Sequence, residues 1–112
     1  MMEERVTILI PTHNRGDLVG KTIMNCFKQT YKDFKILIYD DGSTDNTSTI
    51  IKKLQLSFPN RIQYLKSKSN HGIGYARHEL LKNLSTEFGV WLDSDDYMKI
   101  DRLAKCINYL DS

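Results

Sequence analysis

Four short hydrophobic runs alternate with segments of helical periodicity along this chain. Three of the runs, at residues 6–10, 34–39 and 88–92, are mostly apolar and rich in β-branched and aromatic residues, as buried strands are. The third of the four, at residues 61–65, alternates between polar and apolar residues. Pro11 follows the first run directly, and Pro59-Asn60 breaks the chain before the third. Each run therefore predicts a strand, and the first strand is expected to stop at Pro11.

A helix is predicted after each strand, because apolar residues recur there three or four positions apart. Asp17 is expected in the first turn of the first helix, where a negative charge suits the helix dipole. Either Ser43 or Asp45 is expected to cap the second helix. The recurring residues are Leu18, Thr22, Ile23, Cys26 and Phe27, then Ile50, Ile51 and Leu54, then Ile73, Ala76, Leu80, Leu81 and Leu84, and finally Leu103, Ile107 and Leu110.

The resulting order, βαβαβαβα with short connections, predicts one α/β domain over residues 1–112. Parallel strands need crossover helices, so the expected architecture is a doubly wound, mostly parallel sheet. Ligands of such sheets bind in the crevice at the carboxyl ends of the strands. Candidate chemistry is therefore sought in the residues that directly follow each strand.

The bulk composition narrows the class of protein. The 112 residues are 40% hydrophobic and 27% charged, as in a soluble globular domain. The net charge of +2 is too small to indicate binding to nucleic acid or to an anionic membrane. The apolar run from Val6 to Pro11 is too short for a signal peptide or a membrane span. Cys26 and Cys106 lack metal-ligand spacing, so they are expected to be reduced core thiols of a cytosolic protein.

An acidic cluster follows the fourth predicted strand, where Asp93, Asp95 and Asp96 surround Ser94. Three carboxylates within four residues repel one another, and no turn requires that many. A bound cation would relieve the repulsion, and hard oxygen ligands suit Mg²⁺ or Mn²⁺, which would complete its shell with phosphate oxygens. The alternative is a solvated acidic loop that caps the last helix.

Other strand ends carry candidate ligand-binding residues. Asp40 or Asp41 would accept hydrogen bonds from a base or a ribose, as an acidic residue after the second strand does in dinucleotide folds. Arg77, behind the flexible Gly72-Ile73-Gly74, would pair with a diphosphate through two hydrogen bonds, or form an ordinary ion pair with a nearby carboxylate. His13 is either a hydrogen-bonded turn residue or a ring that stacks on a flat base.

Four motifs in order give the chain a family resemblance. They are Ile-Pro-Thr-His-Asn-Arg at 10–15, Tyr-Asp-Asp-Gly-Ser-Thr-Asp at 39–45, Asn-His-Gly-Ile-Gly-Tyr-Ala-Arg at 70–77 and Trp-Leu-Asp-Ser-Asp-Asp at 91–96. With these motifs at successive strand ends, nearly the whole chain resembles the N-terminal half of the inverting family 2 glycosyltransferases. That resemblance implies the Rossmann-like, nucleotide-sugar-binding half of an A-type glycosyltransferase fold.

The resemblance also implies roles for individual residues. Asp41, with Asp40 as its neighbour, would bind uracil or another base, and Arg77 would approach the diphosphate. The other matched positions are Pro11, Thr12, His13 and Asn14, which would line the base pocket, and Asp93, Ser94 and Asp95, whose Asp-x-Asp pattern holds ribose and metal. In some family members the position of Asp96 is the closer metal ligand, so the metal role stays open among Asp93, Asp95 and Asp96.

The function implied is sugar transfer from a nucleoside-diphosphate donor, most commonly a UDP-sugar, to a hydroxyl of an acceptor glycan, lipid or protein. Mg²⁺ or Mn²⁺ would assist, and the protein would work in the cytoplasm, peripheral to the inner face of the plasma membrane, in cell-surface polysaccharide synthesis. Relatives continue into a half that supplies the acceptor site and an acidic general base. The chain is therefore expected to be truncated, with its general base beyond residue 112, and to be inactive alone.

Two rival functions share this architecture, namely a receiver-like signalling module and a non-catalytic nucleotide-binding domain. A receiver would carry its acidic pair after the first strand, an acceptor aspartate after the third and a lysine after a fifth. In this chain the acidic groups follow the second and fourth predicted strands, and a fifth hydrophobic run is missing. The pattern therefore favours the transferase over the receiver.

Overall fold

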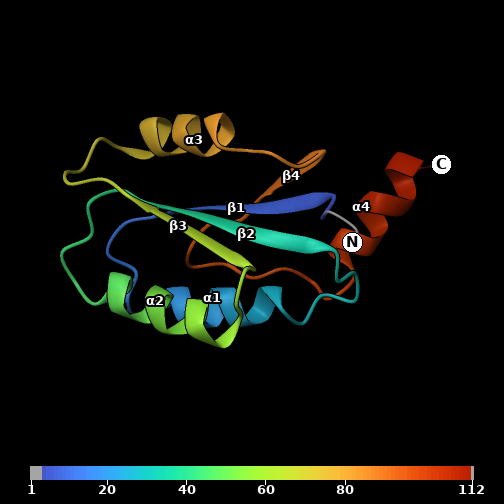
Figure 1. The fold of residues 1–112 in the computed structure, drawn as a ribbon, viewed down its shortest axis with the longest axis horizontal. Coiled ribbons are helices and arrows are strands. Elements are labelled where there is room, and N and C mark those ends of the chain that lie inside the picture. The colour runs from blue at the N-terminus through green and yellow to red at the C-terminus, as the bar shows by residue number, and fades with distance from the viewer. Residues whose placement is uncertain (1–3, 112) are drawn as a thin grey trace.

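The computed structural model describes residues 4–111 as strands and helices in strict alternation (Figure 1). All four strands are parallel and form one sheet in the order β3-β2-β1-β4. The predicted order βαβαβαβα is confirmed. The elements are β1 (Val6–Thr12), α1 (Val19–Cys26), β2 (Phe34–Asp40), α2 (Thr47–Ser57), β3 (Ile62–Lys66), α3 (Ile73–Lys82), β4 (Phe88–Trp91) and α4 (Arg102–Asp111).

Helices cover both faces of the sheet, as a doubly wound fold requires. On one face, Ala76 and Leu80 of α3 pack against residues of β1 and β2. On the other face, α1 and α2 lie side by side, and they share a larger core with α4 (Figure 1). Ile8 and Ile36, at the centre of that core, are fully buried. Each such side chain stabilises the fold by about 1.5–3 kcal/mol, so the two central strands are the most firmly held part of the chain.

Strand β1 continues through Pro11 to Thr12, so the prediction that Pro11 stops the strand is wrong. Backbone groups of successive residues point to opposite neighbours in a parallel sheet, so residues two apart point to the same neighbour. The Leu9 carbonyl accepts from the Leu92 N–H on the β4 side, whereas the Thr12 carbonyl accepts from the Asp41 N–H on the β2 side. Pro11 therefore faces the β4 side, where strand pairing has already ended at Leu9, and its missing N–H breaks no ladder bond.

Helix α1 begins at Val19, so Asp17 lies in the preceding turn and outside the first helical turn where it was expected. The Arg15 carbonyl accepts hydrogen bonds from the N–H groups of Leu18 and Val19, at 3.0 and 2.7 Å. The bond from Leu18 closes a tight turn over residues 15–18, and the helix can start only after it. The apolar periodicity did not reveal this turn, because Leu18 and Val19 are both apolar.

The start of α2 distinguishes the two capping candidates. One carboxylate oxygen of Asp45 accepts from both the N–H and the hydroxyl of Thr47, the first residue of the helix, at 3.0 and 2.5 Å. These bonds, chiefly that from the Thr47 hydroxyl, lower the pKa of Asp45. Ser43 instead accepts from the N–H of Asn14. The N-cap residue of α2 is Asn46, and its side chain makes no capping hydrogen bond, so the prediction that Ser43 or Asp45 is the cap is wrong. Asp45, one position before the cap, nevertheless bonds the first residue of the helix.

Both cysteines are free thiols in different surroundings. Cys26 on α1 is buried in the core, and burial raises the pKa of its thiol to about 12. Cys106 on α4 is half-buried, so the expectation of two core thiols holds only for Cys26. Within residues 4–111, no helix combines the length and the apolar character needed to cross a membrane.

We predict that iodoacetamide at pH 8 modifies Cys106 first and leaves Cys26 intact in the folded chain. The reactive species is the thiolate, which burial suppresses at Cys26. Mass spectrometry should show a single adduct under native conditions and a second in denaturant. Two adducts forming at equal rates without denaturant would show that α1 does not seal the core.

Candidate functional site

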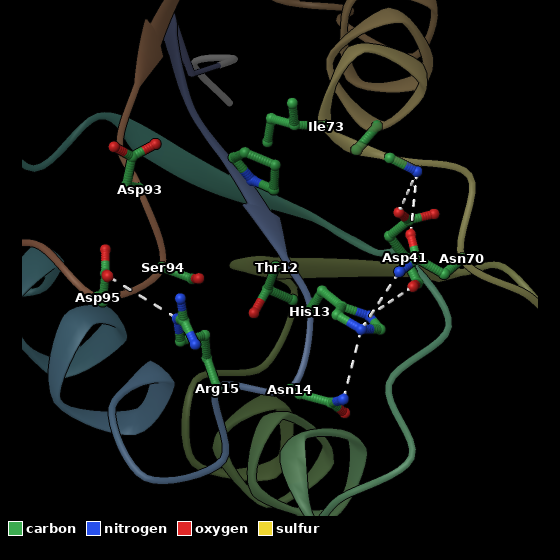
Figure 2. Close-up of a pocket in the computed structure, with 13 residues that line it drawn as sticks. Thr12, His13, Asn14, Arg15, Asp41, Asn70, Ile73, Asp93, Ser94 and Asp95 are labelled. Atoms are coloured by element: carbon green, nitrogen blue, oxygen red, sulfur yellow. Dashed lines mark hydrogen bonds and ion pairs between the residues drawn. The ribbon is translucent and has the colours of Figure 1, made fainter.

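A pocket of about 530 Å³ lies at the carboxyl ends of the strands. Asp41 lines one side of it, Asp93 and Asp95 line the other, and Thr12 lies between them (Figure 2). The structure thus brings together acidic side chains that follow different strands. The lining consists of Pro11, Thr12, His13, Asn14, Arg15, Asp41, Asn70, Gly72, Ile73, Ala76, Asp93, Ser94 and Asp95. Three predicted site residues, Asp40, Arg77 and Asp96, are outside this lining.

The Asp41 carboxylate joins the end of β2 to the beginning of α3. It is buried and accepts hydrogen bonds from the N–H groups of His71 and Gly72, at 2.9 and 2.7 Å. Those N–H groups directly precede α3, where the helix dipole also favours a negative charge. A carboxylate oxygen has two lone pairs, so each Asp41 oxygen can still accept a bond from a ligand.

Gly42 allows the loop over residues 67–72 to pass directly across the end of β2. Its φ of +73° is in the left-handed region that favours glycine. A Cβ atom at this position would be 2.7 Å from the carbonyl carbon of Ser69 and 2.9 Å from the nitrogen of Asn70. A side chain at position 42 would therefore push the loop away from Asp41.

His13 connects the loops after β1 and β2. Its Nδ1 lies 2.7 Å from the carbonyl oxygen of Asp41, and because that oxygen can only accept, Nδ1 carries the proton. Nε2 then accepts from the side-chain amides of Asn14 or Asn70, at 3.3 and 3.4 Å. These bonds occupy the edge of the ring and leave its faces available for packing. His13 is thus a hydrogen-bonded turn residue that also lines the pocket.

Asn14 holds the same two loops together through its own side chain. Its Oδ1 accepts from the N–H groups of Thr44 and Asp45, at 2.8 and 3.3 Å, and its backbone N–H donates to Ser43. Its φ of +51° is a left-handed value that asparagine tolerates better than most residues. The position therefore suits a small residue with an amide acceptor.

Asp40 lies beneath the pocket, on the opposite face of the strand from Asp41. Its carboxylate is fully buried and accepts from the Ser43 N–H at 2.9 Å and the Tyr64 hydroxyl at 2.5 Å. Burial, and then the bond to Asp40, raise the pKa of Tyr64, so its hydroxyl remains a donor. Strand alternation contained this signal, because adjacent residues of a strand cannot both face one pocket.

The acidic cluster after β4 is divided by the fold. Asp93 and Asp95 line the pocket, whereas the Asp96 carboxylate accepts from the N–H of Tyr97 outside it. Across residues 4–111, no three His, Cys, Asp or Glu side chains are grouped closely enough to hold a metal ion. The three-carboxylate site expected from the spacing is therefore not formed, and two carboxylates remain on the pocket wall.

The arginine that lines the pocket is Arg15, whereas the predicted Arg77 lies outside the lining. The guanidinium of Arg77 lies 5.8 Å from the centroid of the Trp91 ring, a cation–π arrangement that neither predicted alternative for Arg77 included. Arg15 instead lines the pocket and lies 3.8 Å from Asp95 (Figure 2). Sequence reasoning missed Arg15, although it ends the first motif.

Thr12 carries an unpaired polar atom at the floor of the pocket. In the described part of the chain, its Oγ1 is buried and has no hydrogen-bond partner. A buried hydroxyl without a partner costs about 1–3 kcal/mol. This hydroxyl is therefore free to bond a molecule that enters the pocket.

We predict that Gly42→Ala destabilises the chain by about 1–3 kcal/mol, since the left-handed backbone and the close approach of the loop both oppose a methyl group. Trypsin should also cut after Lys66 and Lys68 faster in this variant. The matched control is Gly74→Ala, because a Cβ there meets nothing within 4 Å. Since Gly74 is helical, that change should stabilise the chain by up to about 1 kcal/mol. Equal denaturation midpoints for the two variants would contradict the role given to Gly42.

Comparison with known proteins identifies the family. Residues 7–112 match the profile described as Glycosyl transferase family 2. The chain is 35% identical over 109 residues to UDP-Glc:alpha-D-GlcNAc-diphosphoundecaprenol beta-1,3-glucosyltransferase WfaP of Escherichia coli, covering 97% of this chain and 42% of the relative.

Solved structures show the same fold. TarS residues 1–349 of S. aureus, in complex with UDP, has a TM-score of 0.87 and 26% identity, over 98% of this chain and 32% of that one. The mannosyltransferase PcManGT of Pyrobaculum calidifontis, in complex with GDP-Man and Mn²⁺, has a TM-score of 0.89 over 100% of this chain and 34% of that one. At 23% identity, the latter likeness concerns the fold alone.

The chain spans 14–42% of the length of eight curated relatives that it matches. All eight are named as glycosyltransferases or as a glucosyltransferase, which contradicts the receiver-like alternative. Since the family profile covers nearly every residue, this chain belongs to glycosyl transferase family 2 and has the A-type glycosyltransferase fold.

Proposed function

We propose that this chain binds the nucleoside diphosphate of a sugar donor, with UDP as its nucleotide, together with a divalent metal. The full protein would transfer the sugar to an acceptor hydroxyl. The observation that carries the proposal is the convergence of Asp41, from the end of β2, with Asp93 and Asp95, after β4, on one pocket. The unpaired hydroxyl of Thr12 lies in the same lining and adds a polar group that is free to bond a ligand.

The pocket offers each part of the donor a suitable neighbour. Asp41 accepts from an N–H of the base through a free lone pair, and the faces of the His13 ring are available to stack on the base. Ser94 and the carboxylate of Asp93 lie on the opposite wall, where the ribose would bind. Pro11 and Asn14 complete the wall beside the base. Neither Asp40 nor Arg77 needs to move for this arrangement.

The residues present fit Mg²⁺ or Mn²⁺. Asp93 and Asp95 are hard oxygen donors in the pocket lining, and the Asp95 side chain is 46% exposed. Mg²⁺ is commonly bound by one or two protein carboxylates, and phosphate oxygens of the substrate fill other coordination positions. When bound, the ion supplies positive charge that offsets the negative charge on the leaving diphosphate.

The comparisons support the nucleotide and the acceptor class. TarS structures contain UDP or UDP-GlcNAc, and the E. coli relative is named for UDP-Glc. The acceptor in that relative's name, alpha-D-GlcNAc-diphosphoundecaprenol, is lipid-linked. A glycan or lipid-linked acceptor would place the full protein in the cytoplasm, at the inner face of the membrane, in the synthesis of cell-surface polysaccharide.

Isothermal titration with UDP, with and without Mn²⁺, tests the proposal. We expect binding that strengthens when Mn²⁺ is present. Asp93→Asn and Asp95→Asn should each weaken the metal-dependent binding by at least about tenfold, a loss typical even of groups one shell further from a metal. Asp96→Asn should have little effect, because its carboxylate accepts from Tyr97 outside the pocket. A folded sample that binds no UDP in either condition would refute the proposal.

Thr12→Val separates a ligand-binding hydroxyl from a structural one. Valine matches threonine in shape and removes the unpaired buried Oγ1, so we expect the melting temperature to rise. UDP affinity should fall severalfold, because the hydrogen bond to the ligand is lost. Thr12→Ser, which keeps a hydroxyl, should retain most of the affinity. A valine variant that is less stable and binds UDP as well as the native chain would show that the hydroxyl has a partner within the fold.

A further inference from the structure

An ion pair joins Arg15 and Asp95 on one side of the pocket. The Arg15 Nε lies 3.8 Å from a carboxylate oxygen of Asp95, and each side chain is 46% exposed. Figure 2 shows the Arg15 side chain extending from the loop after β1 toward Asp95, on the side of the pocket that also carries Ser94. At 3.8 Å the contact is electrostatic and too long for a hydrogen bond. An exposed pair of this kind is weak and can exchange partners.

The backbone of Arg15 is fixed, whereas its side chain is half exposed. The Arg15 N–H donates to the Thr47 hydroxyl at 3.0 Å, and its carbonyl accepts from the N–H groups of Leu18 and Val19. The starting point of the side chain is therefore held between β1, α1 and α2. Rotation about its side-chain bonds moves the guanidinium within the pocket without any change in the fold.

Arg15 differs from the other residues of the pocket lining in the sign of its charge. The lining has three carboxylates, from Asp41, Asp93 and Asp95, and Arg15 is the lining residue that carries a permanent positive charge. A divalent cation on Asp95 would compete directly with Arg15. A diphosphate would bring new negative charge, and a guanidinium binds phosphate through two parallel hydrogen bonds. Arg77, over Trp91, is not in the lining.

We propose that Arg15 is an exchangeable counter-ion, paired with Asp95 in the empty pocket and with the donor diphosphate once a divalent cation occupies Asp95. This inference rests on the proposed function. It makes metal binding and diphosphate binding cooperative, because Arg15 opposes a metal that arrives alone and favours the diphosphate that follows. By linkage, UDP raises the metal affinity by the same factor as the metal raises the UDP affinity.

The test compares Arg15→Gln with the native chain in two separate measurements. Mn²⁺ binding without nucleotide is followed by the paramagnetic resonance signal of free Mn²⁺. Loss of the competing charge should raise that affinity about two- to fivefold, the range for an exposed ion pair. UDP affinity in saturating Mn²⁺ should fall about tenfold, since a charge-assisted pair is lost. Affinity for uridine, which has no phosphate, should not change.

Two further variants define the outcomes. Arg102→Gln removes an arginine charge on α4, away from the pocket, and should alter neither affinity. Arg15→Lys keeps the charge and loses the planar fork, so Mn²⁺ affinity should stay native and UDP affinity should fall only in part. An Arg15→Gln variant whose Mn²⁺ affinity equals that of Arg102→Gln, or lies below it, overturns the counter-ion role. Native chain that binds no UDP overturns the proposed function, and this inference with it.

Discussion

The rest of the pocket depends on the hydrogen bonds that the Asp41 carboxylate accepts from the N–H groups of His71 and Gly72. These bonds join the end of β2 to the beginning of α3. They fix the end of the loop over residues 67–72, whose beginning is held by the bond from the Ser67 N–H to the Asp40 carbonyl. The carbonyl of Asp41 accepts from His13, so Asp41 also orients the loop after β1. A single residue at a strand end thus helps to fix the relative positions of three loops.

Because successive residues of a strand point to opposite faces, Asp40 has a structural position and its neighbour Asp41 lines the pocket. Asp40 points toward the face covered by α1 and α2, where Tyr64 and Ser43 satisfy its buried carboxylate. Asp41 points toward the α3 face and the pocket. Burying a carboxylate is costly unless donors surround it, and each aspartate meets two. The two neighbouring acids can therefore both be buried without repelling each other at one site.

Negative charge in the pocket faces backbone donors on one side and the half-exposed guanidinium of Arg15 on the other. Asp41 is fixed by N–H groups, whereas Asp95 faces the flexible side chain of Arg15. The fixed side suits a neutral, planar base, and the exchangeable side suits a metal ion with a diphosphate. Thr12, with an unsatisfied hydroxyl between the two sides, shows that the pocket retains polar capacity that the fold does not use.

Hydrophobic patterning by itself determined the number, order and type of the elements. Strands buried on both faces read as continuous apolar runs, a strand buried on one face alternates, and a helix buried on one face repeats every 3.6 residues. The parallel topology followed from the alternation, and it placed the acidic segments at one sheet edge. Tertiary structure alone decided which of the acids after β4 face the pocket. Asp96 and Arg77 have the right chemistry and neighbouring positions, yet local bonds to Tyr97 and packing on Trp91 hold them elsewhere. Arg15 lines the pocket from the loop between β1 and α1, where its carbonyl closes a turn with Leu18, and apolar patterning does not record the hydrogen bonds that form such a turn.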